Sequence, residues 1–168
     1  MRTALCIACG LLAALSIGRA QAQTKLAGKM TCAKPEPNYT TPVGDHANHT
    51  LLLGATKCTY SQGDLGGAKL KEEVDAYTSD ITGNLSHDKG YGVGTLASGD
   101  KYFLRFKGTT TMKGEAPASA QCTWSFTGGT GKLKGLTGQG TCAGTYSADG
   151  ASSWDIQGEY ATPEAKSK

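Results

Sequence analysis

The feature of this 168-residue chain that most restricts its fold is a two-residue alternation of apolar and polar side chains, which recurs after residue 50. In one segment Tyr102, Leu104 and Phe106 alternate with mostly cationic neighbours, and glycine-bearing turns separate this segment from similar ones. A period of two indicates half-buried β-strands, and short spacing between turns is typical of an antiparallel barrel or sandwich. We therefore predict an all-β fold. The 24 glycines, roughly twice the usual share, argue against a helical bundle.

The alternation continues to the end of the chain and predicts one dry inner face. Its large residues of even number are Tyr102, Leu104, Phe106, Cys122, Trp124, Phe126, Cys142, Tyr146, Trp154, Ile156 and Tyr160. If residues 120–127 pair with 138–146 as a hairpin, Cys122 lies near Cys142 on that face.

Residues 1–22 are predicted to be a signal peptide. Arg2 supplies a positive start, a mostly apolar stretch of 14 residues runs from Ala4 to Ile17, and Ala20-Gln21-Ala22 fits a signal-peptidase site. A transmembrane helix would need about 20 apolar residues, so we expect a secreted or periplasmic protein without a membrane span. The rest is expected to form a single β-barrel domain over residues 23–162 and a polar tail at 163–168.

The charge of the mature chain does not favour nucleic acid as a partner. Removing Arg2 and Arg19 from the 17 basic residues leaves 15 against 14 acidic ones. Arg105 is then the only arginine, so the clustered guanidinium groups that bind phosphates are missing.

Four cysteines follow the leader, namely Cys32, Cys58, Cys122 and Cys142. An even number in an exported protein predicts two disulfides, with three possible connectivities. Spacing favours Cys32–Cys58 and Cys122–Cys142, and each bond would contribute about 3 kcal/mol in the loop-entropy model. A zinc site is disfavoured because these four cysteines include no CxxC pair.

Two segments depart from the strand pattern. Residues 33–50 contain three prolines, and we interpret them as a long loop after an early strand at residues 26–32. Between Lys69 and Tyr77, apolar residues fall at a helical spacing that a twisted strand also accommodates, so helix and strand both stay open there.

The strongest motif is the glycine-rich segment 126–135, followed by Gly138 and Gly140. It fits no phosphate-binding loop, because Leu133 stands where a P-loop needs Ser or Thr and Lys134 stands where a dinucleotide loop needs Gly. We therefore interpret the glycines as residues of positive φ that turn one strand into the next.

This turn, Thr127-Gly-Gly-Thr-Gly-Lys-Leu-Lys-Gly135, resembles that of the allene oxide cyclase and dirigent superfamily, and residues 90–95 and 99–102 resemble small exported bacterial proteins with the same barrel. The resemblance covers about residues 85–161. It implies an antiparallel eight-stranded β-barrel with a hydrophobic lumen, which is often trimeric in plants. Plant cyclases act on a fatty-acid epoxide, and dirigent proteins steer phenoxy-radical coupling. Lipocalin and immunoglobulin folds are the alternative architectures.

Candidate catalytic groups are few, and no catalytic residue is assigned. Ser86, His87 and Asp88 are consecutive, so as strand residues they would point to opposite faces and form no triad, and we expect a solvated turn. Glu73 and Asp75 are expected on a wet face together with Glu72. His46 and His49, with Asp45 nearby, could offer two or three metal ligands, but no closing ligand is evident. We expect an exposed polar loop there, no bound metal and no cofactor.

Aromatic side chains on the inner face either pack a core or line a cavity for an apolar ligand. The candidate ligand-binding residues are Tyr91, Tyr102, Phe106, Trp124, Phe126 and Trp154. Our leading hypothesis is a non-catalytic exported barrel that binds a small apolar or phenolic molecule or serves as a stable scaffold. The alternatives are an isomerase or cyclase acting on a lipid or phenolic substrate in the lumen, and an interaction module that assembles as a homotrimer.

Overall fold

The computed structural model describes residues 23–162, so the expected signal peptide at 1–22 and the polar tail at 163–168 lie outside the described residues. The elements are β1 (Thr24–Cys32), β2 (Asn38–Pro42), β3 (His49–Gln62), β4 (Asp64–Leu65), β5 (Ala68–Thr82), β6 (Leu85–Leu96), β7 (Lys101–Lys113), β8 (Ala116–Gly129), the 3₁₀ helix η1 (Gly131–Leu133), β9 (Thr137–Tyr146) and β10 (Ser152–Ala161). No helix of this part of the chain is long and apolar enough to cross a membrane.

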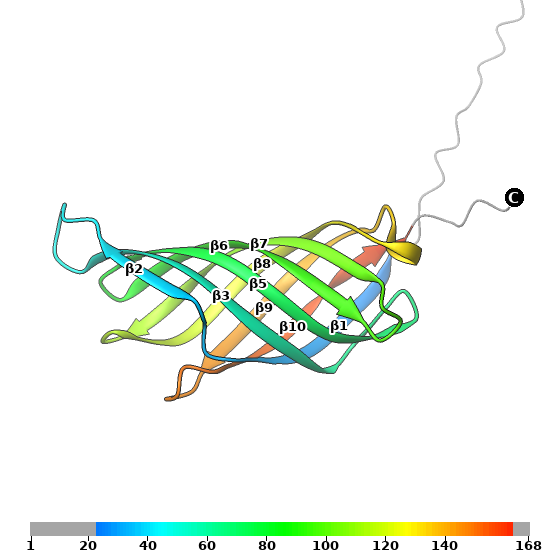
Figure 1. Ribbon diagram of the computed structural model, residues 1–168, viewed down its shortest axis with the longest axis horizontal. Coiled ribbons are helices and arrows are strands. Elements are labelled where there is room, and N and C mark those ends of the chain that lie inside the picture. The colour runs from blue at the N-terminus through cyan, green and yellow to red at the C-terminus, as the bar shows by residue number, and fades with distance from the viewer. Residues whose placement is uncertain (1–22, 163–168) are drawn as a thin grey trace, which may run out of the picture.

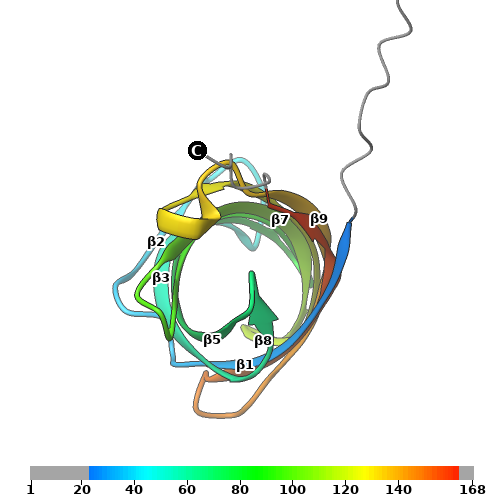
Figure 2. The ribbon, with the colours of Figure 1, turned by 90° about the vertical axis from the view of Figure 1, so that its right-hand side faces the viewer.

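Eight long strands close into a barrel (Figures 1 and 2). The order β3-β1-β10-β9-β8-β7-β6-β5 is completed by a pairing of β3 with β5, and each neighbouring pair is antiparallel. The short strands β2 and β4 pair with β3 and β5 respectively. The predicted antiparallel eight-stranded β-barrel is thus confirmed.

The predicted alternation sets the inside and outside of the wall. On β7, Tyr102 and Leu104 are buried whereas Lys101, Arg105 and Lys107 are not. The predicted hairpin of β8 with β9 is present. Both tryptophans face the interior, from β8 and β10.

Both disulfides form as the spacing predicted, and each joins directly opposed residues of neighbouring strands. Cys122–Cys142 links β8 to β9. Cys32–Cys58 links β1 to β3, which pair at only four positions between Lys29 and Cys32. This second bond therefore fastens the shortest seam of the barrel.

One end of the barrel is closed by leucines. Leu65 of β4 has no exposed surface, and Leu133 of η1 is 1% exposed. Leu96 and Leu136 are buried at the same end, which faces the viewer in Figure 2. The backbone N–H of Gly66 donates to the Tyr160 hydroxyl at 3.1 Å, which ties the β4 turn to the wall.

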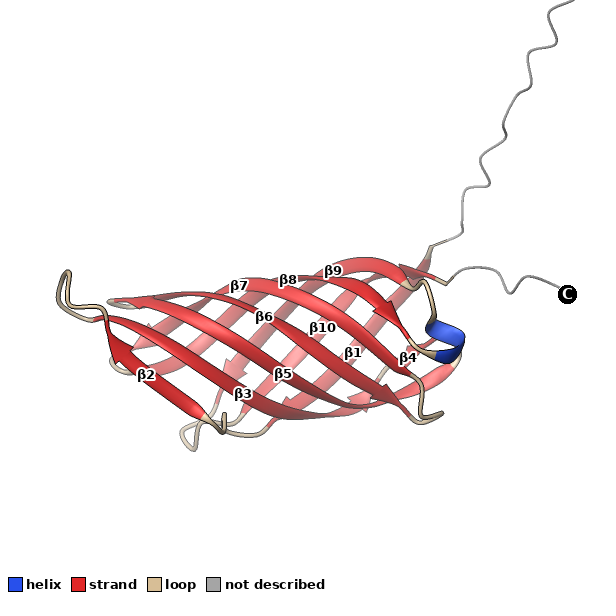
Figure 3. Cartoon of the chain, turned by 45° about the horizontal axis from the view of Figure 1, so that its top comes forward, coloured by secondary structure: helices blue, strands red, loops and turns tan. Residues whose placement is uncertain are grey.

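The expectation that residues 33–50 contain no regular element was wrong. Residues 38–42 form β2, which pairs with the start of β3 (Figure 3). β2 lies at an edge, where a proline such as Pro42 can end the strand without removing a ladder hydrogen bond from a second neighbour. The connection around them lacks strands only at residues 33–37 and 43–48.

Residues 69–77 belong to the long strand β5, which settles the alternative between helix and strand. The register of β5 against β6 shifts between Leu70 and Glu72. An irregularity of this kind changes the parity of the strand, so that Leu70 and Glu73 both face inward. The next inward side chains are Asp75, Tyr77 and Ser79.

Candidate functional site

The barrel interior contains a cavity of about 870 Å³. At one end its lining includes the exposed residues Lys34, Asn84 and Glu115, which lie on the turns opposite the closed end. At depth the lining includes Leu70 and Glu73. The cavity is therefore a pouch with one mouth, at the end of the barrel where β5 turns into β6 and β7 turns into β8.

The two sides of this pouch differ in chemistry. From β5 and β6 the inward side chains are largely polar or absent: Glu73, Asp75, Tyr77, Ser79, Ser86, Asp88 and the glycines at 90, 92 and 94. From β7, β8, β10 and β1 they are largely apolar: Leu104, Phe106, Trp124, Phe126, Trp154, Ile156, Leu26 and Met30. We call these the polar wall and the aromatic wall.

Inward glycines make room for the large rings. Gly94 on β6 pairs with Tyr102 on β7. A Cβ added at Gly94 would lie within the ring of Tyr102. A Cβ at Gly144 would likewise meet the indole of Trp154. Because these glycines carry no side chain, the rings lie flat across neighbouring strands.

The deepest polar group is the Glu73 carboxylate, which is 3% exposed. Its Oε2 accepts hydrogen bonds from the Tyr102 hydroxyl at 2.5 Å and the Tyr60 hydroxyl at 3.1 Å. The two hydroxyls are themselves 3.1 Å apart. Burial raises the pKa of both tyrosines well above the usual value, and the charge of Glu73 adds to this, so both remain donors.

Asp75 is the second buried carboxyl group of the polar wall. Burial raises its pKa well above the ordinary value, and the neighbouring charge of Glu73 raises it further. Burial also raises the pKa of Glu73, but the tyrosine hydroxyls oppose this by hydrogen bonding to the anion. Two close carboxyl groups ionise in turn. We therefore assign Glu73 as the group that ionises first and Asp75 as the acid that keeps its proton to higher pH.

One carboxyl oxygen of Asp75 lacks a hydrogen-bond partner within the described part of the chain. Its Oδ1 is buried and has no hydrogen-bond partner among the described residues. The nearby Sγ of Cys58, 3.9 Å from Oδ2, belongs to a disulfide and has no proton to donate. Buried polar atoms are normally paired, so Asp75 lacks the full set of hydrogen bonds that would stabilise its charged form.

A further polar group of the same wall lies on β6. Asp88 accepts hydrogen bonds from the Ser86 hydroxyl at 2.6 Å and from the Thr110 hydroxyl at 2.7 Å. His87 points outward between Ser86 and Asp88, as strand alternation requires, so the three form no triad. The expectation of a solvated turn was wrong, because this segment is a strand and Ser86 is only 2% exposed.

Five of the six predicted aromatic residues line or border the cavity, namely Tyr102, Phe106, Trp124, Phe126 and Trp154. The placement of Tyr91 on the inner face was wrong. Tyr91 is 70% exposed and has the outward parity of β6, whose inward positions there are glycines. The tryptophan N–H groups are already used, that of Trp124 by the Thr141 carbonyl and that of Trp154 by the Ser152 hydroxyl.

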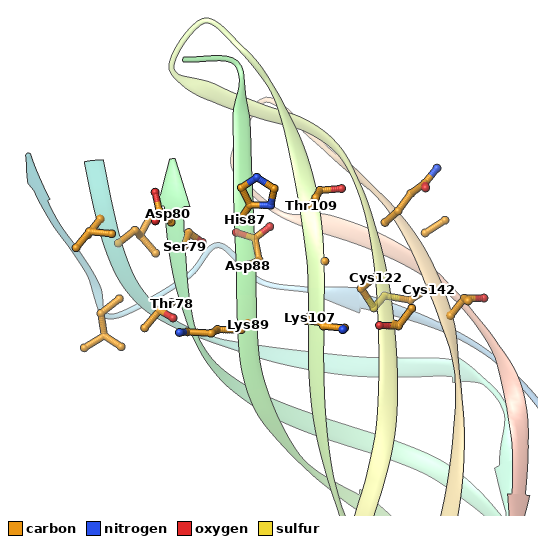
Figure 4. Close-up of a pocket in the computed structure, with 18 of the residues that line it drawn as sticks. Thr78, Ser79, Asp80, His87, Asp88, Lys89, Lys107, Thr109, Cys122 and Cys142 are labelled. Carbon is orange, nitrogen blue, oxygen red and sulfur yellow. A yellow bond between two sulfur atoms is a disulfide. The ribbon is translucent and has the colours of Figure 1, made fainter. Parts of the chain in front are cut away.

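The outer wall carries different groups. Lys89 and Lys107 lie opposite each other on β6 and β7, and His87 lies opposite Thr109 (Figure 4). Asp45 and His46, in the turn between β2 and β3, lie close to His49 at the start of β3, and the three could hold a metal ion.

Comparison with known proteins adds no precedent for these groups. No protein-family model matches the chain, and no curated protein matches its sequence. Function is therefore inferred from the cavity and from the side chains around it.

Proposed function

We propose that this protein binds one small, largely apolar or phenolic ligand inside its barrel. The observation that carries this proposal is the cavity of about 870 Å³ inside a barrel that leucines close at one end. Small-molecule sites usually measure about 300–1,000 Å³, and an eight-stranded barrel can hold one small ligand.

The walls indicate how such a ligand would lie. A ring or acyl chain would pack against Phe106 and Trp124 of the aromatic wall. A hydroxyl group on the same ligand would hydrogen-bond to a polar side chain of the polar wall, such as Asp75 or Asp88. Sites of this kind combine a mainly apolar lining with a few polar groups that fix orientation.

We also propose export and membership of the allene oxide cyclase and dirigent superfamily. The two disulfides support export, because such bonds persist in oxidising compartments. The glycine-rich turn at residues 127–135 supports the family, and with it a trimeric assembly.

Ligand binding is tested by titrating the purified protein with hydrophobic dyes and substituted phenols while following tryptophan fluorescence. Both tryptophans line the cavity, so we expect saturable quenching with one ligand per chain. In Ala120→Leu, a larger side chain enters the cavity, and we expect affinity to fall about tenfold, the effect of roughly 1.4 kcal/mol.

Ala143→Leu is the matched control, because Ala143 lies on the outer face of β9 and is exposed. Its affinity should equal that of the wild type. Absence of saturable quenching with every compound would contradict the proposal and leave the scaffold role. Equal weakening in both variants would place the ligand outside the barrel.

A second candidate is an isomerase or cyclase that acts on a lipid or phenolic substrate in the same pouch. The pairing of an acid, Asp75, with a carboxylate, Glu73, favours it, since environments that separate two pKa values define acid and base roles. Confinement in the pouch would hold a flexible substrate in one folded conformation.

This candidate predicts products of one handedness. Unsaturated fatty-acid epoxides and phenols undergoing one-electron oxidation would be incubated with the protein and the products separated by chiral chromatography. Asp75→Asn should lower the rate by at least about 100-fold, the usual contribution of a general acid, while dye binding persists. Racemic products from the wild type would leave only the binding function.

A further inference from the structure

A cluster of metal-ligating side chains lies outside the barrel, at the turn between β2 and β3. Asp45, His46 and His49 each offer one ligand atom, and the three atoms lie within 4.8 Å of one another. Asn48, with φ of 60°, turns the chain so that residues so close in sequence converge. The sequence shows the three residues, but the turn brings them together.

The cluster is held in place by the backbone. The Asp45 Oδ1 accepts a hydrogen bond from the backbone N–H of His46 at 2.8 Å. The same oxygen lies 2.6 Å from Nδ1 of His49 and 3.1 Å from Nδ1 of His46. The two imidazole rings stack with their centroids 4.7 Å apart. Both Nδ1 atoms therefore face one carboxylate oxygen.

A second carboxylate orients His49 from the barrel wall. Oδ1 of Asp80, on β5, lies 2.9 Å from Nε2 of His49, whose side chain is only 14% exposed. A histidine that ligates a metal through one nitrogen usually donates its other N–H to a carboxylate, which fixes the tautomer. Both ring nitrogens of His49 face carboxylate oxygens, so a metal would replace the hydrogen on Nδ1 while Asp80 keeps the Nε2–H and the orientation of the ring.

The three ligand atoms lie close enough to surround one small cation after side-chain rotation. Zn²⁺ binds imidazole nitrogen and carboxylate oxygen at about 2.0–2.2 Å in a tetrahedron, so its ligand atoms are about 3.3–3.6 Å apart. The Asp45 Oδ1 and the His49 Nδ1, which are hydrogen-bond partners 2.6 Å apart, would move apart to this distance, and the widest pair, within 4.8 Å, would move closer. Two imidazoles and one carboxylate suit late first-row divalent ions, whereas Ca²⁺ and Mg²⁺ prefer oxygen ligands.

We propose that Asp45, His46 and His49 bind one divalent late first-row transition-metal ion such as Zn²⁺, with Asp80 as the residue that orients His49. Three protein ligands leave the fourth position of a tetrahedral ion to water. This proposal differs from our expectation of a polar loop without metal. That expectation was based on the sequence, in which no further residue to complete the site was evident. Asp80 is the missing support, and it lies 31 residues away from His49.

The test is calorimetric titration of the purified protein, prepared without a histidine tag, with ZnCl₂. We expect one ion per chain at saturation. His49→Ala should weaken binding at least about 100-fold through loss of a direct ligand, and Asp80→Ala should weaken it about 10–100-fold. Circular dichroism verifies that each variant keeps the barrel.

His87→Ala is the matched control, because His87 lies on β6 opposite Asp80 and is the remaining histidine of the chain (Figure 4). Its affinity for Zn²⁺ should remain within about twofold of the wild type. Absence of stoichiometric binding, or equal losses in His87→Ala and His49→Ala, would overturn the assigned ligand set. Binding of Ca²⁺ as tight as that of Zn²⁺ would overturn the class of metal. Because the site lies outside the pouch, these outcomes do not depend on the proposed ligand.

Discussion

For Asp75→Asn, we expect the free energy of unfolding, measured relative to that of the wild type, to increase as the pH rises. The folded state raises the pKa of Asp75, so the folded wild type holds a proton that the unfolded chain releases above about pH 4. The stability of the wild type therefore falls with rising pH, by up to about 1.4 kcal/mol per pH unit, until Asp75 ionises in the folded state. The asparagine does not titrate and avoids this loss. We therefore expect the free energy of unfolding of the variant, relative to that of the wild type, to be larger at pH 7 than at pH 4.

The measurement is urea denaturation at several pH values between 4 and 8. Ser79→Ala is the control, since Ser79 is a buried neighbour on the same face of β5 and does not titrate. Its difference from the wild type should be constant with pH. A constant difference for Asp75→Asn as well would show that Asp75 is ionised in the folded protein. The acid role proposed for it would then be wrong.

Gly94→Ala is expected to cost about 3–5 kcal/mol of stability. The new Cβ would lie within the ring of Tyr102, so the ring must move and the Tyr102 hydroxyl must leave Glu73. Overpacking of a core costs about 1–3 kcal/mol, and loss of a hydrogen bond to a charged group costs about 1.5–3 kcal/mol. Thermal and urea unfolding measure the loss.

Gly28→Ala is the matched control on β1, because the nearest atom to its added Cβ is the Gln62 carbonyl oxygen at 3.3 Å. We expect a change within about 1 kcal/mol. The double variant Gly94→Ala/Tyr102→Ala should cost little more than Tyr102→Ala alone, because the clash is absent once the ring is removed. Additive costs would show that Gly94 acts independently of Tyr102.

The sequence was sufficient to predict the strands in which one face is apolar and the other polar. On β7, β8 and β10 the inward positions carry Tyr102, Trp124 and Ile156, and the outward positions carry polar groups, so parity alone identifies the interior. The same parity placed Cys122 opposite Cys142. The aromatic wall was therefore predicted almost completely.

The polar wall was not predicted because on β5 acidic side chains face the interior and an apolar side chain faces outward. On β5 the acidic Glu73 and Asp75 face inward while Val74 is 46% exposed, contrary to the usual preference of these residues. The irregularity near Leu70 also moves the inward positions from even to odd numbers. One signal was present in the sequence, since Glu73, Asp75, Tyr77 and Ser79 form a continuous series of hydrogen-bonding residues at a period of two.

Other errors came from features that local sequence does not encode. β2 exists because the start of β3 offers a free edge, which no pattern within residues 33–50 indicates. Tyr91 was assigned inward as an aromatic residue, but the glycines beside it are the inward positions. The Tyr60 hydroxyl reaches Glu73 from the neighbouring strand β3, a contact that depends on the register of β3 against β5.

The short seam between β1 and β3 has a consequence for how long a ligand stays inside. β1 and β3 pair at four positions, and the Cys32–Cys58 bond crosses them. With this bond intact the strands cannot part there, so a molecule enters and departs through the mouth alone. Reduction would leave that junction to its few backbone hydrogen bonds and provide a side exit. Under the proposed binding function, we expect reduction of this bond to shorten the residence time of the ligand.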